Sequence, residues 1–172
     1  ATSASDAAER TIAELSGRRA SVSYALRVDS AEEYLEIRES LAKEGYRRLV
    51  VGGVVRDIDE VRPSEAGRPD VGVEVVVDRL KLSATESRRL QQALEIAWER
   101  GGGRAELRVE ASSEDEPARH VPIGRGLVCP SCARLFDPPR PGLFSYNSPL
   151  GACADCRGFG RVIAVDWDKV IP

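Results

Sequence analysis

The four cysteines of this chain form two identical pairs, and this pattern constrains the fold more than any other feature. Cys129 and Cys132 enclose Pro-Ser, Cys153 and Cys156 enclose Ala-Asp, and twenty residues separate the two pairs. Zn²⁺ prefers four soft donors at the corners of a tetrahedron, and each C-x2-C turn can supply two thiolates. The spacing therefore predicts one structural zinc ion held by all four cysteines.

Two disulfides, redox-active dithiols or four unrelated thiols are the alternatives to zinc. Nothing in the sequence suggests secretion, and disulfides are uncommon inside cells. A closed shell of four thiolates leaves no coordination position for water or substrate, so the predicted site organises a fold and catalyses nothing by itself. His120 is the one histidine of the chain. It could serve a site of three cysteines and one histidine, but a lone histidine beside a domain boundary is more often ordinary surface.

The composition indicates a folded protein with one main core and a small appendage. Of the 172 residues, 42% are hydrophobic and 31% are charged, with a formal net charge of −3. This balance gives the whole chain no electrostatic footprint for nucleic acid. No apolar run approaches the roughly 20 residues that cross a membrane, so we expect a cytoplasmic protein. The chain contains no methionine, which suggests a piece excised from a longer protein.

Strand and helix patterns alternate through the first two thirds of the chain. Apolar and polar residues alternate from 20 to 28, as in a half-buried strand. Ser30-Ala-Glu-Glu33 matches a capping box, and Gly52-Gly53 separates two valine-rich runs, as in a tight hairpin. The predicted elements are helices at 6–15, 30–45 and 86–100, strands at 20–28, 71–78 and 105–109, and a hairpin at 49–55, with a loop at 62–70.

After the first helix, this order reads β-α-β-β-α-β and predicts an α+β fold. The order suits an antiparallel or mixed sheet, and we predict a mixed sheet with both helices on one face. The polar, acidic stretch at 111–119 has no periodicity and marks a boundary. We therefore expect an α/β domain at 1–118 and a small four-cysteine zinc module at 119–172, with a return strand at 161–166.

No motif for nucleotide chemistry occurs in the sequence. A G-x-x-x-x-G-K-[ST] phosphate loop and a G-x-S-x-G nucleophile elbow are both absent. The glycines at 101–103 follow a predicted helix, so they indicate a helix stop. We therefore expect the chain neither to bind ATP tightly nor to be an enzyme.

The segment from Leu143 to Gly160 carries the most specific resemblance. Its sequence, Leu-Phe-Ser-Tyr-Asn-Ser-Pro-Leu-Gly-Ala-Cys-Ala-Asp-Cys-Arg-Gly-Phe-Gly, closely resembles the segment around the first zinc module of the UvrA family. Cys129-Pro-Ser-Cys132 lies where the earlier cysteine pair of that family stands. The run from Glu74 to Arg79 resembles the valine-rich strand of the UvrB-binding domain of UvrA, and Gly45-Tyr-Arg-Arg-Leu-Val50 resembles the entry to its preceding strand.

The resemblance covers the chain from about residue 20, with two departures. Residues 27–33 replace a basic Lys-Gly turn of the family, and residues 135–142 alter its approach to the aromatic run. UvrA is the damage-sensing ATPase of bacterial nucleotide excision repair. The resemblance implies a zinc-organised fragment whose 1–118 domain recruits UvrB, the helicase-like partner, to damaged DNA.

The same resemblance implies that the ATP sites lie elsewhere in a longer, homodimeric parent. DNA would be bound through that parent, and weakly or not at all by the fragment, and no membrane partner is implied. A divergent UvrA-like paralogue tied to drug resistance would share these motifs but bind another partner. Charges at the exit of the predicted hairpin are the candidate UvrB contacts, although without the family they would be ordinary solvated surface: Arg56, Asp57, Asp59, Glu60 and Arg62.

Two other interpretations rest on the cysteine region. Arginines there are interleaved with Phe144 and Tyr146, so a nucleic-acid-binding zinc ribbon is possible, unless the aromatic rings pack under the zinc loops. The run from Cys153 to Gly160 also fits the C-x2-C-x-G-x-G repeat of J-domain co-chaperones. The first cysteine pair lacks those glycines, which weakens the chaperone interpretation.

Overall fold

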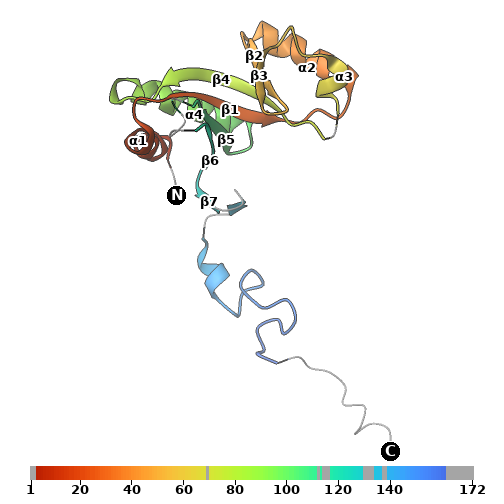
Figure 1. Ribbon diagram of the computed structural model, residues 1–172. Coiled ribbons are helices and arrows are strands. Elements are labelled where there is room, and N and C mark those ends of the chain that lie inside the picture. Colours follow the sequence, from red (N-terminus) through yellow and green to blue (C-terminus); the bar gives the residue numbers. More distant parts are fainter. Residues whose placement is uncertain are drawn as a thin grey trace, which may run out of the picture. The chain divides into compact units, whose positions relative to one another are not determined.

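The alternating residues after position 19 form strand β1 (Arg19–Leu26), which lies inside an antiparallel six-stranded sheet in the computed structural model (Figure 1). The structure describes residues 3–68, 70–111, 113, 117–129, 134–136 and 139–161. The chain divides into two units, Ala1–Phe136 and Asp137–Pro172. The sheet belongs to the first unit, in the order β3-β2-β4-β1-β5-β6, with β2 at Arg48–Val51, β3 at Val54–Asp57, β4 at Val73–Lys81, β5 at Arg104–Val109 and β6 at Arg119–Gly124.

The α+β class and the β-α-β-β-α-β order are confirmed, and the sheet has the antiparallel form in place of the predicted mixed one. Strand β4 lies between β1 and β2 and is antiparallel to both. Strand β1 in turn lies between β4 and β5. Each β-α-β unit is therefore split by an inserted strand, so its two parallel strands are not neighbours.

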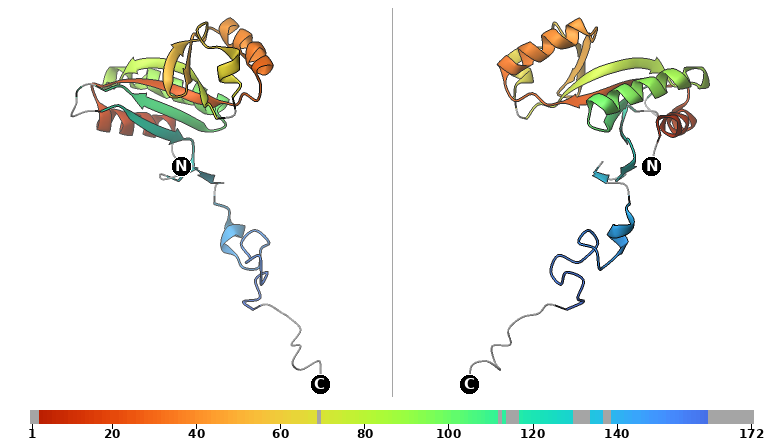
Figure 2. Two further views of the ribbon diagram at one scale, coloured as in Figure 1. Left: turned by 45° about the vertical axis from the view of Figure 1, so that its right-hand side comes forward. Right: turned by 180° about the vertical axis from the view of Figure 1, so that it is seen from behind.

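Four α-helices accompany the sheet in the described part of the chain: α1 (Ala4–Leu15), α2 (Ala31–Lys43), α3 (Pro63–Ala66) and α4 (Ser87–Arg100), with a 3-10 turn η1 (Ala84–Glu86) before α4. Helix α4 lies against β1, β4 and β5 on one face of the sheet, and α1 packs against α4 (Figure 2). An ion pair of 2.6 Å between Arg100 and Glu44 joins the C-terminal ends of α4 and α2. Helix α3 lies in the stretch predicted as a loop, because Pro63 pre-forms the first turn of this one-turn helix.

The start of α2 differs in detail from the predicted capping box. Ser30 Oγ accepts a hydrogen bond of 3.1 Å from the Glu33 amide, as expected. The Glu33 carboxylate, however, accepts from the Asp29 amide at 2.6 Å instead of returning to Ser30. A reciprocal capping box occurs at α1, where Ser3 and Asp6 each bond the backbone of the other.

One apolar core lies between the sheet and the helices. The predicted apolar face of α4 is buried in full, and it belongs to the same cluster as Val22, Leu107 and the fully buried Tyr34 of α2. The buried face of α4 consists of Leu90, Ala93, Leu94, Ala97 and Trp98.

Tyr34 gives a first prediction about stability. Its hydroxyl is buried and has no hydrogen-bond partner among the described residues. A buried, unsatisfied hydroxyl costs about 1–3 kcal/mol. We expect Tyr34→Phe to raise the free energy of unfolding by about 1 kcal/mol in urea denaturation, and Tyr24→Phe gives a matched control. A loss of stability in Tyr34→Phe would mean that the hydroxyl has a bound partner.

Strand β6 extends the first unit beyond the expected boundary at 118/119. It pairs with β5 along its whole length. The indole nitrogen of Trp98 donates to the Ile123 carbonyl at 2.8 Å, and Arg18 donates to the carbonyls of Glu110 and Pro117 at 2.6 and 2.7 Å. The sequence pattern did not predict this strand, because Arg-His-Val-Pro-Ile-Gly contains a proline and only a short alternation of apolar and polar residues. An edge strand tolerates the missing amide of Pro122.

The cysteine region follows β6. A short hairpin of β7 (Leu127–Val128) and β8 (Leu135–Phe136) ends the first unit. The second unit contains a 3-10 turn, η2 (Pro141–Phe144), followed by tight turns. The return strand predicted at 161–166 falls almost wholly outside the described residues. Within the described part of the chain, no helix has the length and apolar character needed to cross a membrane.

Candidate functional site

The first cysteine turn is framed by the β7–β8 hairpin. The Cys129 amide donates to the Arg134 carbonyl at 2.9 Å, which continues the pairing of the hairpin by one residue. Cys132 lies outside the described residues.

The second cysteine turn is compact and favours a thiolate. The Arg157 amide donates to the Cys153 carbonyl at 2.8 Å, and the Phe159 amide donates to the Cys156 carbonyl at 2.9 Å. Hydrogen bonds from the backbone amides of Cys156 and Asp155 lower the pKa of Cys153 below its usual value. A thiolate is the form that binds Zn²⁺, so the chemistry of this turn fits a metal ligand.

Glycine is required where the second turn meets the aromatic run. Gly158 has a φ of 92°, and a Cβ there would lie 2.2 Å from the Tyr146 carbonyl oxygen. Within the described residues, no group of three or more His, Cys, Asp or Glu side chains gathers as a metal site. The four-cysteine zinc site therefore remains a prediction.

The five predicted partner contacts lie at the end of strand β3 and in the segment that follows it. Arg56 forms an ion pair of 2.9 Å with Glu65, and Asp59 forms one of 2.7 Å with Arg47. Asp57 accepts from the Asp59 amide at 3.0 Å. Glu60 and Arg62 are exposed, and neither has an ion pair to another described residue. The structure thus places the five residues on one short segment, where three of them already hold the local fold.

A basic groove that sequence reasoning missed lies across the ends of β1, β2 and β4. The groove encloses about 350 Å³, and its ionisable lining comprises five basic residues and two glutamates. The residues come from separate strands and a helix, so only the sheet topology brings them together. They are Arg19, Arg48, Arg79, Lys81 and Arg89, with Glu86 and Glu110.

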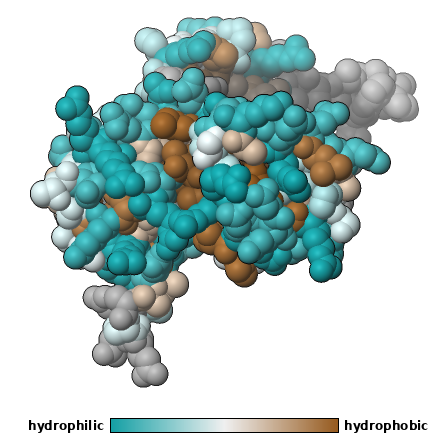
Figure 3. All heavy atoms as spheres, turned by 90° about the horizontal axis from the view of Figure 1, so that it is seen from above, coloured by the Kyte–Doolittle hydropathy of each residue, from teal (hydrophilic) through white to brown (hydrophobic). Residues whose placement is uncertain are grey.

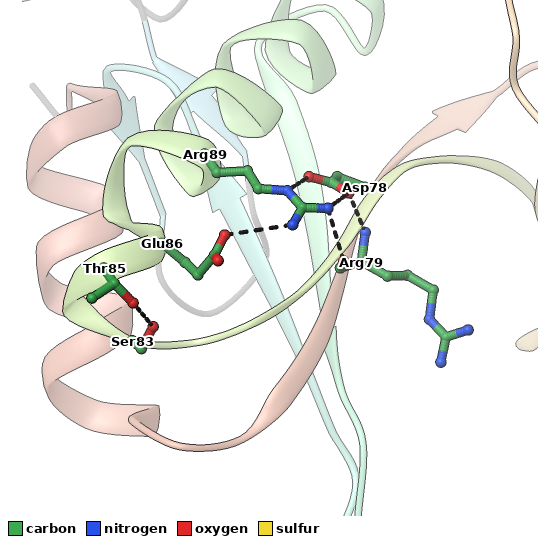
Figure 4. Close-up of polar contacts among 6 residues, drawn as sticks. All are labelled: Asp78, Arg79, Ser83, Thr85, Glu86 and Arg89. Carbon is green, nitrogen blue, oxygen red and sulfur yellow. Dashed lines mark hydrogen bonds and ion pairs between the residues drawn. The ribbon is translucent and has the colours of Figure 1, made fainter.

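Two of the five basic residues are paired and three are not. Arg89 contacts Asp78 at 2.7 Å and Glu86 at 3.5 Å, while the side chain of Arg79 points away from this cluster (Figure 4) and reaches Glu110 at 2.5 Å. The three remaining side chains belong to exposed residues and have no ion pair to any described residue: Arg19, Arg48 and Lys81. The groove therefore carries excess positive charge that an acidic partner could neutralise.

Apolar residues are exposed in both units. The surface in Figure 3 is mostly hydrophilic with separate apolar areas, and the hairpin residues Val54 and Val55 of the first unit are 56% and 40% exposed. In the second unit, Phe144, Tyr146 and Phe159 are 81%, 69% and 72% exposed. These exposed rings do not pack under the cysteine turn of their own unit.

The fold and its surface define this protein as a small α+β domain with a basic groove, followed by a cysteine-rich module. A family model described as the UvrA interaction domain matches residues 3–111. The chain therefore belongs to the UvrA interaction domain family, as the sequence resemblance predicted.

Three relatives show the extent of the similarity. UvrABC system protein A of Salmonella typhimurium is 36% identical over 139 residues, which is 81% of this chain and 14% of the relative. The proteins of the same name from Escherichia coli K12 and Haemophilus influenzae are 35% and 33% identical, with the same coverage. The chain spans about 14% of the length of these relatives.

Proposed function

We propose that this chain is the partner-docking part of a nucleotide excision repair ATPase and that it recruits UvrB. The match of residues 3–111 to the UvrA interaction domain carries this proposal. The chain itself supplies docking and no ATP chemistry, because its sequence has no phosphate-cradling loop. Nucleotide hydrolysis and contact with damaged DNA would belong to the rest of a longer, homodimeric protein.

The basic groove is the docking surface that the described charges support best. Five basic side chains converge there against two glutamates, so an acidic segment of UvrB would find complementary charge. The predicted contacts from Arg56 to Arg62 form a second, mixed-charge surface. Exposed charges act on association rate and specificity more than on folding, so charge reversal can separate the two surfaces without unfolding the domain.

Charge reversal gives the direct test. We expect Arg48→Glu with Lys81→Glu to weaken UvrB binding at least about tenfold, with an unchanged melting temperature because both residues are exposed. The matched control is Glu60→Lys with Arg62→Glu, which reverses two exposed charges at the hairpin exit. Titration calorimetry at two salt concentrations measures both pairs.

The outcomes of this test lead to different conclusions. If only the control pair weakened binding, the docking surface would be the hairpin exit. If the unaltered chain failed to bind UvrB at all, a UvrA-like paralogue with another partner, such as those tied to drug resistance, would replace this proposal.

We also propose that Cys129, Cys132, Cys153 and Cys156 together bind one structural zinc ion. The hairpin around Cys129 and the amides that stabilise the Cys153 thiolate support this assignment. When bound, zinc would crosslink two loops that have little apolar core of their own. Metal analysis should return one zinc per chain, and disulfides in freshly reduced protein would contradict the assignment.

The exposed rings of the second unit favour one further candidate function, nucleic-acid binding. Three arginines, Arg140, Arg157 and Arg161, accompany the exposed Phe144, Tyr146 and Phe159 among the described residues of this unit. Bases stack on such rings, while arginines contact phosphates. Titration with labelled single-stranded DNA at low and high salt tests this, with Phe144→Ala plus Phe159→Ala as the variant. Equal binding by the variant would assign these rings to contacts within a longer chain.

A further inference from the structure

Five polar residues form a connected cluster on the sheet face opposite α4. Side chains alternate between faces along a strand, so Ser23, Glu74, Glu106, Arg108 and His120 point away from the core that contains Val22 and Leu107. They come from four strands, β1, β4, β5 and β6. The cluster thus bridges the interior of the sheet and its edge strand β6.

Three residues of this cluster, Ser23, Glu74 and Arg108, form hydrogen bonds and an ion pair with one another. Arg108 donates to both carboxylate oxygens of Glu74, and Ser23 Oγ donates to Glu74 at 2.6 Å. The side chains of Glu74 and Arg108 are only 14% and 26% exposed. Arg108 is therefore committed to Glu74 and cannot fully neutralise a second carboxylate.

Glu106 is the second carboxylate of the cluster. Its side chain is 21% exposed, and its buried Oε2 lies 2.8 Å from His120 Nε2 without a well-oriented hydrogen bond to any described residue. Burial raises the pKa of Glu106, and Glu74 raises it further, while His120 and Arg108 act in the opposite direction. A buried carboxylate beside a second carboxylate costs free energy unless a proton or a cation accompanies it.

We propose that Glu106 keeps its carboxyl proton to a higher pH than an exposed glutamate does, and that loss of this proton loosens edge strand β6 from the sheet. The protonated carboxyl is neutral, so it can lie buried beside Glu74 without a second cation. Once the proton is lost, Glu106 is an anion with no cation of its own. Strand β6 is then held by its backbone hydrogen bonds to β5 and by the Trp98–Ile123 hydrogen bond.

The direction of the pH dependence follows from the raised pKa of Glu106. The folded state binds this proton more tightly than the unfolded state does. The stabilisation is therefore fully present below the ordinary carboxyl pKa and is lost as pH rises through the folded value. Strand β6 should therefore be held more firmly below the folded midpoint of Glu106 than above it.

Carbon-13 NMR of the Glu106 carboxyl in the full 172-residue chain tests the first half of the proposal. We expect its midpoint to lie above that of Glu39, an exposed glutamate whose pKa is lowered by Lys43. A Glu106 midpoint at or below the ordinary value of a glutamate would overturn this half of the proposal. This measurement needs no substitution, so it does not depend on a variant folding.

Hydrogen exchange of the β6 amides, corrected for intrinsic rates, tests the second half. Each unit of pKa difference changes the opening equilibrium about tenfold, so protection of Val121 and Ile123 should fall by about that factor per unit as pH rises through the midpoint measured for Glu106. Glu106→Gln should remove this dependence and Glu39→Gln should leave it unchanged. A pH dependence that persists in Glu106→Gln, or no dependence in the unaltered chain, would overturn the proposal.

Discussion

Chelation of zinc should unfold the region around Cys153 and Cys156 while the α+β unit stays folded. The buried apolar cluster lies wholly within residues 4–109, so the first unit has a core that does not depend on metal. In the second unit the large apolar side chains with a described exposure all lie on the surface. Its order would come from metal coordination, since small metal-bound modules commonly lose their fold without the ion. NMR spectra recorded before and after chelation would show the two units separately.

Cys153→Ser supplies the matched variant for this experiment. It should reproduce the chelated spectrum for residues 139–161 and leave the resonances of the sheet in place. Ser113→Ala is a suitable control, because this serine lies in the polar stretch between β5 and β6. Retention of order around Cys156 after complete loss of metal would contradict the zinc assignment, and loss of the sheet signals would contradict the independence of the first unit.

Trp98→Ala should produce the largest loss of stability in the first unit, about 4 kcal/mol in the free energy of unfolding. Trp98 is 3% exposed within the core, and its indole nitrogen donates to the Ile123 carbonyl at 2.8 Å. The substitution opens a cavity below the sheet and also removes the side-chain contact between α4 and β6. Urea denaturation followed by circular dichroism measures the change.

Two companion variants separate the contributions of Trp98. Trp98→Phe keeps most of the packing but removes the donor, so its cost should be about 1–3 kcal/mol. Ile96→Ala on the same helix should cost much less, because Ile96 is 40% exposed. If Trp98→Ala were no more harmful than Ile96→Ala, the core between α4 and the sheet would be misassigned.

Local patterns in the sequence determined most of the elements and their buried faces. The spacing of Leu90, Leu94 and Trp98 identified the buried face of α4, because residues four apart lie on the same side of a helix and an apolar side packs on the core. Gly52 and Gly53 identified the β2–β3 turn, where both residues adopt positive φ angles that favour glycine. The motif around Cys153 pointed to the family that the match over residues 3–111 then confirmed.

Only the tertiary structure decided which strands are neighbours and which charges meet. Strand β6 was hidden because pairing with β5, and not its own residues, makes it a strand. The insertion of β4 between β1 and β2 brings Arg19, Arg48 and Arg79 to one groove, although these residues are far apart in the sequence. The same sheet joins Glu106 to His120. Periodicity reports which face of a strand is buried, but strand order depends on long-range packing that no short stretch of sequence contains.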